Sequence, residues 1–145
     1  MKKFLLLLPA LLLSGAAAVR GEKRTVGTTP YWVADYNSLT YHGAGAPMNW
    51  DAFTDPKYGA AGRKFIPSGT AVSVSAGKIV PADGTLDTLL MISNANQANP
   101  SDSPSGYGLV VSGSVYESQL PDSTGVPAQL AGPVRAKATR FYLQP

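Results

Sequence analysis

The sequence predicts an all-β protein: a small barrel- or sandwich-like body of five or six short strands with an extended N-terminal arm. Fifteen glycines and twelve prolines lie between short apolar runs in a chain of only 145 residues, and this punctuation favours short strands joined by turns. Several of the runs alternate apolar and polar residues, which is the period of a strand. Beyond the N-terminal segment, only residues 127–138 offer a candidate helical pattern longer than two turns.

The first expected strand lies within residues 29–43, because this segment is rich in Tyr, Trp, Val and Thr, which favour strands. Residues 44–64 follow as a long irregular loop. Its aromatic residues, Trp50, Phe53 and Tyr58, are expected to pack against the core and hold the loop in place.

The clearest pattern is a hairpin in residues 65–84. One strand alternates strictly, which predicts one buried face. Ala76 and Gly77 supply a tight turn, since glycine accepts a positive φ without steric cost. The return strand ends at Pro81, which has no N–H to donate to a ladder. The expected faces are Thr70, Val72 and Val74 on one side and Ala71, Ser73 and Ser75 on the other.

The remaining strands are shorter or less regular. Residues 88–92 form a continuous apolar run, as expected of a strand buried on both faces, and a polar loop follows at 93–106. The final strand lies within 139–145, with Phe141 and Leu143 facing inward. Between the polar loop and the final strand, a further strand is expected at 109–116. Strict alternation predicts one face with Leu109, Val111, Gly113 and Val115 and another with Val110, Ser112, Ser114 and Tyr116.

The N-terminal segment MKKFLLLLPALLLSGAAAVR permits two interpretations. Two lysines, an apolar run over residues 4–13 and a small-residue stretch ending at Ala18 have the three-part form of a secretory signal peptide cleaved after Ala18. The run is too short to span a membrane, which takes roughly 20 apolar residues. The alternative is a retained arm whose leucines are buried against a neighbouring subunit, with Pro9 breaking any helix through it.

The sequence contains no convincing catalytic, cofactor or metal site, and we expect a protein that is not an enzyme. There is no cysteine, and His42 is the only histidine, whereas a catalytic histidine needs a nucleophile and an orienting acid. Ser75 and Lys78 match S-x-x-K formally, but they lie on a hairpin turn rather than a helix. The net charge of +3 comes from scattered residues, so nucleic-acid contact is not expected.

Two segments and the end of the chain carry a resemblance to a known family. KFIPSGTAVSVSAGKIVPADG, residues 64–84, resembles the IPSGT…G…P hairpin of tailed-phage head decoration proteins, also called capsid cement proteins. VSGSVYESQLPDSTGVPAQL, which begins at Val111, is similar to that family's G-x-V-Y-E-x-x-L-P-D-x-T-G region. The terminal RFYLQP is similar to the short aromatic ending of such chains. The similarity covers roughly residues 64–145.

This resemblance implies a lambda-type decoration protein. Such a protein is a structural virion component on the outer surface of the phage head, where it binds the major capsid protein as a homotrimer and stabilises the lattice against the pressure of packaged DNA. No cofactor, nucleic acid or membrane contact is implied. The Leu-rich start departs from the family pattern, and the alternative is an exported β domain, secreted or periplasmic, that binds an extracellular or envelope partner.

On the decoration-protein interpretation, residues 1–28 are the arm, 29–63 a strand with an irregular capsid-facing loop, and 64–145 the β-rich body. Capsid contact is expected mainly in the strand-like segment before the body, because exposed backbone edges can pair with a neighbour. The expected contact residues are Thr25, Val26, Gly27, Thr28, Thr29, Pro30, Tyr31 and Trp32, together with Phe4, Leu5, Leu6, Leu7 and Leu8.

Overall fold

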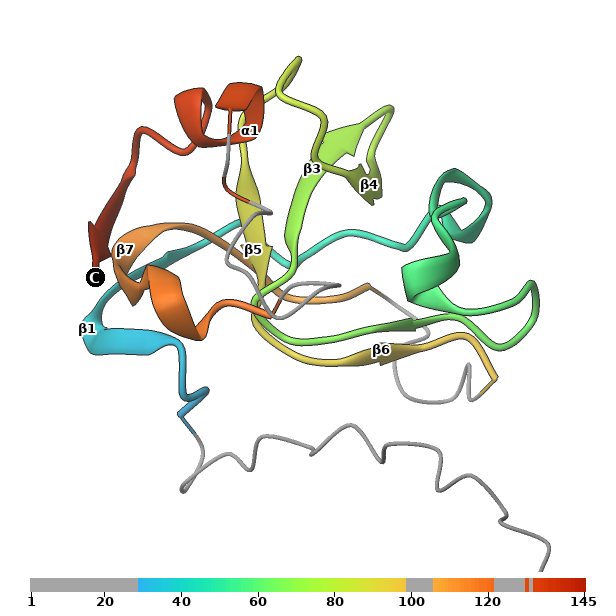
Figure 1. Ribbon diagram of the computed structural model, residues 1–145, viewed down its shortest axis with the longest axis horizontal. Helices are drawn as coiled ribbons and strands as arrows, with labels where there is room; N and C mark the ends of the chain where they lie inside the picture. The colour runs from blue at the N-terminus through green and yellow to red at the C-terminus, as the bar shows by residue number, and fades with distance from the viewer. Residues whose placement is uncertain (1–28, 99–105, 122–129, 131) are drawn as a thin grey trace, which may run out of the picture.

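The computed structural model describes residues 29–98, 106–121, 130 and 132–145. Six strands form the main sheet, and two further strands of two residues each pair with one another. The order in the main sheet is β1-β7-β5-β3-β4, with β8 also paired with β7 (Figure 1). The strands are β1 (Val33–Tyr41), β3 (Ala71–Ser75), β4 (Lys78–Pro81), β5 (Leu89–Met91), β7 (Leu109–Tyr116) and β8 (Phe141–Gln144), with β2 (Phe65–Ile66) and β6 (Ala95–Asn96) in the small sheet.

The expected all-β class is confirmed. Helical structure in the described part consists of α1 (Gly132–Ala136), the 3-10 turns η1 (Trp50–Ala52), η2 (Pro56–Tyr58) and η4 (Glu117–Gln119), and Leu130 in 3-10 conformation. The candidate helical stretch at 127–138 therefore contains only one short helix within its described residues. The eight strands exceed the five or six expected, mainly because β2 and β6 are too short to produce a pattern.

The β3–β4 hairpin is confirmed with its turn. Pairing runs without interruption from Val72 opposite Pro81 to Ser75 opposite Lys78. Ala76 and Gly77 have φ values of 48° and 74°, and two successive positive φ angles match the right-handed twist of the flanking strands.

The single buried face expected for β3 is wrong. Thr70, Ala71, Val72 and Ser73 are all buried, because β3 lies between β4 and β5 and both faces of the sheet are covered there. Ala71 is in register with Leu90, and Leu90 with Val110, so these three side chains lie on one face. The neighbouring pairs, Val72 with Leu89 and Met91 with Leu109, lie on the other.

Two hydrophobic cores result, one on each face. We call the first the loop core, because Phe53 and Tyr58 from the loop at 44–64 pack into it with their rings 5.0 Å apart in an edge-to-face arrangement. This confirms the expected role of the loop aromatics, which include Trp50 packed against the same core. Figure 1 shows this loop at the opposite end of the molecule from β1 and β8. The buried members of the loop core are Ala46, Phe53, Tyr58, Ile66, Val72, Ile79, Leu89, Met91, Ala95, Tyr107 and Leu109.

The second core, which we call the C-terminal core, lies on the opposite face. Phe141 is buried in it and Leu143 packs against it, as the alternation of the final strand predicts. Trp32 is fully buried there. The expectation that residues 88–92 are buried on both faces is confirmed for β5, since Leu90 belongs to the C-terminal core while Leu89 and Met91 belong to the loop core. The buried members are Trp32, Val33, Ala71, Leu90, Val110, Val115, Leu120, Leu130, Ala138 and Phe141.

Strict alternation fails in β7. Val110 and Val115 both belong to the C-terminal core, although four residues lie between them and strict alternation would place them on opposite faces. The ladder between β1 and β7 shifts register between each successive pair, and Val111 is an extra residue in β7, because the adjacent residues Thr40 and Tyr41 are opposite Ser112 and Val110. A β-bulge of this kind reverses the faces that follow it. The prediction that Val115 shares a face with Leu109 is therefore wrong, and Ser114 and Tyr116 lie on the loop-core face instead.

Residues 29–63 are built into the same body as 64–145. β1 pairs with β7, from Val33 opposite Val115 to Tyr41 opposite Val110. The main sheet thus includes a strand that we expected to precede the body, and its Val33 is a buried member of the C-terminal core.

Candidate functional site

The expected contact segment is only partly within the described residues. Thr25, Val26, Gly27, Thr28 and residues 4–8 lie outside them. Thr29 and Tyr31 are half-buried, and Pro30 is buried. Burial also raises the pKa of Tyr31 above its ordinary value.

Trp32 is committed to the interior of the domain. Its side chain is fully buried, and its indole Nε1 donates a hydrogen bond to Ser68 Oγ at 2.9 Å. Its carbonyl oxygen accepts a hydrogen bond from the backbone N–H of Tyr116 at 2.8 Å. A side chain held in this way offers no surface to a neighbour while the fold is intact. We therefore no longer expect the Trp32 side chain to contact a capsid.

The residues considered for chemistry lie apart. His42 is exposed beyond the end of β1, whereas Ser75 and Lys78 are exposed and face each other across the β3–β4 turn. In the described part of the chain, no three His, Cys, Asp or Glu side chains come close enough to hold a metal ion.

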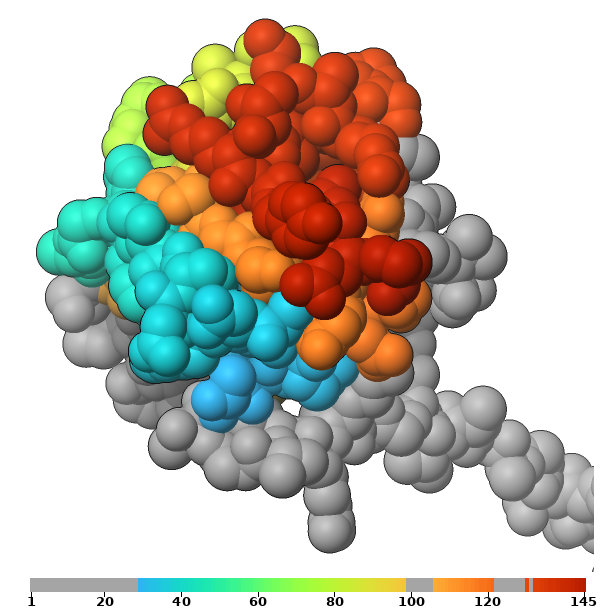
Figure 2. Space-filling view, turned by 90° about the vertical axis from the view of Figure 1, so that its left-hand side faces the viewer, coloured from blue at the N-terminus to red at the C-terminus, as the bar shows by residue number. Residues whose placement is uncertain are grey.

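A more distinctive feature is an uncovered end of the main sheet. The loop core covers one face of β7 at Leu109 and Val111. Beyond the bulge in β7 the same face carries Ser114, which is half-buried, and Tyr116, which is exposed. Figure 2 views the molecule from this end, where β8 (dark red), β7 (orange) and β1 (light blue) lie side by side.

We call this uncovered area the β7–β8 face, and define it by Asp35, Ser114, Tyr116, Tyr142 and Gln144. Tyr142 is opposite Ser114 and Gln144 is opposite Tyr116 in the parallel β7–β8 pair, while Asp35 of β1 is opposite Ser114 on the other side. Tyr142 is 71% exposed and Tyr116 38%. Gln144 Nε2 donates to Ser114 Oγ at 2.8 Å, which fixes the polar groups between the two rings.

The edges of this end are open. Among the described residues, no strand pairs with the second edge of β8 or of β1. An unpaired strand edge presents backbone N–H and C=O groups that another chain can complete. The β7–β8 face thus combines exposed tyrosine rings with backbone edges.

The bulge in β1 is held by side chains. Between Asp35 and Thr40 the strand has three more residues than β7 has between Ser114 and Ser112. Ser38 Oγ donates to the Asp35 carbonyl at 2.7 Å and accepts from the Ser114 N–H at 2.8 Å, so a hydroxyl replaces a missing ladder bond.

Two further tyrosines are exposed on β1, Tyr36 and Tyr41. The side-chain hydrogen bond of Tyr41 to Tyr36, aided by partial burial and by the electrostatic effect of Tyr36, raises the pKa of Tyr41 to about 12. The pair is therefore linked through its hydroxyl groups across the bulge.

The β7–β8 face does not follow from the alternating pattern alone. One signal was present, because the alternation that turns Phe141 and Leu143 inward also turns Tyr142 outward. The position of Tyr116 on the same face depends on the extra residue Val111 in β7, which the alternating pattern does not reveal.

None of the helices in the described residues has the length and apolar character needed to cross a membrane. The chain matches no protein-family model, no curated protein and no solved structure.

Proposed function

We propose that this chain is a capsid decoration protein of a tailed phage, which binds the major capsid protein on the outside of the head as a homotrimer. The observation that carries the proposal is the β7–β8 face. Interface cores are enriched in tyrosine and depleted in charged residues, and this face presents Tyr116 and Tyr142 with one carboxylate, Asp35.

The sequence resemblance supports the same surface. Of the three segments that resemble decoration proteins, one contains β7 from Val111 onward and one contains β8, and these two strands pair with each other. The third forms the β3–β4 hairpin at the other end of the sheet order. The protein acts by contact, through rigid β structure and open edges that pair with neighbours. Many copies on one lattice strengthen weak individual contacts through avidity.

The test is binding of the full chain to phage heads that lack it, measured by co-sedimentation, with the oligomeric state measured by analytical ultracentrifugation. Tyr142→Ser should weaken binding about tenfold, as expected for an interfacial tyrosine worth more than 1 kcal/mol. Leu86→Ser is the matched control, because Leu86 is also exposed, at 41%, but lies between β4 and β5. Failure of the full chain to bind heads would refute the function, whereas equal binding by both variants would refute only the surface.

A second candidate rests on the N-terminal segment, whose form is that of a signal peptide. In this case the chain is an exported β domain with an extracellular or envelope partner. The intact mass of the protein from its natural source separates the two candidates. A chain that begins at Val19 supports export, and a chain that begins at Met1 or Lys2 supports the retained arm of a decoration protein.

A further inference from the structure

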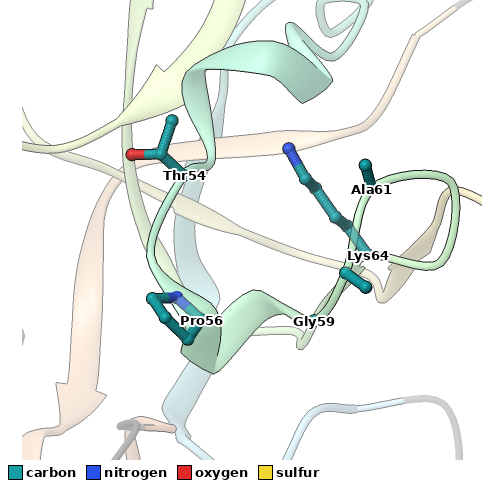
Figure 3. Close-up of a pocket in the computed structure, with 6 residues that line it drawn as sticks. Thr54, Pro56, Gly59, Ala61 and Lys64 are labelled. Atoms are coloured by element: carbon teal, nitrogen blue, oxygen red, sulfur yellow. The ribbon is translucent and has the colours of Figure 1, made fainter.

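The loop at 44–64 forms an open depression of about 510 Å³. Figure 3 shows Lys64 and Ala61 along one side of it, with Thr54 and Pro56 along the other. Most of the lining is apolar; the Thr54 hydroxyl and the Lys64 ammonium are its polar side-chain groups. The lining residues are Thr54, Pro56, Gly59, Ala60, Ala61 and Lys64.

Lys64 is unusual for a lysine because only 8% of it is exposed. Its ammonium Nζ donates one hydrogen bond, at 2.6 Å, to the backbone carbonyl of Trp50. An ammonium has three N–H donors. None of the ion pairs in the described part of the chain involves Lys64; they are Lys57 with Asp55, Arg135 with Glu117 and Arg140 with Asp87.

A buried charge without a counter-charge is costly, and buried cations in proteins are normally paired. Lys64 is nevertheless held in place both at its backbone and at its ammonium group. Its backbone N–H donates to Gln97 Oε1 at 3.3 Å and its carbonyl accepts from the Gln97 N–H at 2.8 Å. The ammonium cannot move into solvent without losing the Trp50 contact.

The wall opposite Lys64 is also rigid. Asp55 caps η2 by accepting the Lys57 N–H at 2.9 Å, and this hydrogen bond lowers the pKa of Asp55. The Asp55 carboxylate is therefore occupied by its own turn and by Lys57, whose Nζ lies 3.4 Å from it. It does not serve as the counter-charge for Lys64.

We propose that the depression binds a carboxylate carried on a short apolar stem. The carboxylate accepts the remaining N–H groups of Lys64, and the stem packs against Pro56, Gly59 and Ala60. A single ammonium in an apolar lining suits a monovalent carboxylate better than a phosphate, which usually draws several donors. The carboxylate comes from a free monocarboxylate or from the side chain or terminus of a neighbouring protein.

The test is the thermal stability of the full chain in sodium butyrate, compared with sodium chloride at equal ionic strength and with butyramide, which has the same stem without the charge. A ligand that binds only the folded state raises Tm, by roughly 3–6 °C at tenfold saturation for a domain of this size. We expect a saturable rise with butyrate alone. If the Tm of the unaltered protein does not rise in butyrate, or rises equally in butyramide, the proposal is overturned.

Lys64→Met keeps the length of the side chain and removes the charge, and Lys78→Met is the matched control at an exposed lysine. The butyrate effect should vanish in the first variant and persist in the second; persistence in both would overturn the proposal. If Lys64→Met additionally weakens self-association or head binding, the carboxylate belongs to a neighbouring protein; if not, it is a free monocarboxylate.

Discussion

The β3–β4 hairpin and the β1–β7 pair differ in how their register is fixed. In the hairpin, four successive residue pairs follow one another without a shift, and a two-residue turn joins them. In the β1–β7 pair, the strands are far apart in sequence and the register shifts at every step. The hairpin is therefore specified locally, whereas the bulged pair depends on tertiary contacts around Gly113 and Ser38. The two regions also differ in their proposed role. The hairpin is part of the framework of the domain, whereas the bulged pair borders the β7–β8 face.

Matched substitutions at two glycines should give the largest contrast. A Cβ at Gly113 would lie 2.6 Å from Leu39 Cδ2 and 3.2 Å from its Cα, whereas a Cβ at Gly77 meets nothing within 4 Å. Gly113→Ala should cost about 4 kcal/mol of unfolding free energy, since backbone strain and overpacking contribute about 1–3 kcal/mol each. Gly77→Ala should cost about 1–2 kcal/mol for its positive φ alone.

Urea denaturation followed by tryptophan fluorescence measures both free energies. Equal losses in the two variants would contradict the distinction between a locally specified hairpin and a tertiary bulge.

A smaller effect is expected at the hydroxyl that replaces a ladder bond. Ser38→Ala removes the acceptor of the Ser114 N–H and should cost about 1–2 kcal/mol, because a half-buried donor is left unsatisfied. Ser75→Ala is the hairpin control, since Ser75 is exposed, and should lie within about 0.5 kcal/mol of the unaltered protein. Urea denaturation measures the unfolding free energy of both variants. If Ser38→Ala leaves this free energy unchanged, solvent can replace the hydroxyl.

The smallest effect is electrostatic and confined to high pH. The pKa of Tyr41 is raised from 10.0 to about 12, chiefly by its hydrogen bond to Tyr36. As pH rises, the Tyr41 hydroxyl ionises at a lower pH in the unfolded chain than in the folded protein. The stabilisation from the protonated Tyr41 is therefore complete below pH 10 and is lost as pH rises towards 12. Tyrosinate absorbance should include a late-titrating tyrosine near pH 12, and Tyr36→Phe should return the pKa of this tyrosine towards its ordinary value. An unchanged titration in Tyr36→Phe would disprove the link.

The elements that the sequence predicts well are those whose signal is local. The β3–β4 turn follows from Ala76 and Gly77, and the inward side chains of β8 follow from alternation at Phe141 and Leu143. The doubly buried β5 follows from its continuous apolar run. In each case the residues that carry the signal are adjacent in the chain.

The elements that it misses are set by distant segments. Burial of Ser73 arises because both faces of β3 are covered by chain segments that are remote in sequence. The face of Val115 depends on a bulge in β7 opposite Thr40 and Tyr41 of β1. These residues lie about seventy positions earlier in the chain, and a window of alternating residues does not contain them. The β7–β8 face escapes prediction for the same reason, as does the burial of Lys64 beneath the carbonyl of Trp50.

The position of β5 has a consequence for how the protein denatures. Three consecutive residues pack alternately into the two cores: Leu89 and Met91 into the loop core and Leu90 into the C-terminal core. Neither core can therefore unfold while the other stays folded. Heat or denaturant should thus produce one cooperative transition, with fluorescence from Trp32 on one side and Trp50 on the other changing at the same midpoint.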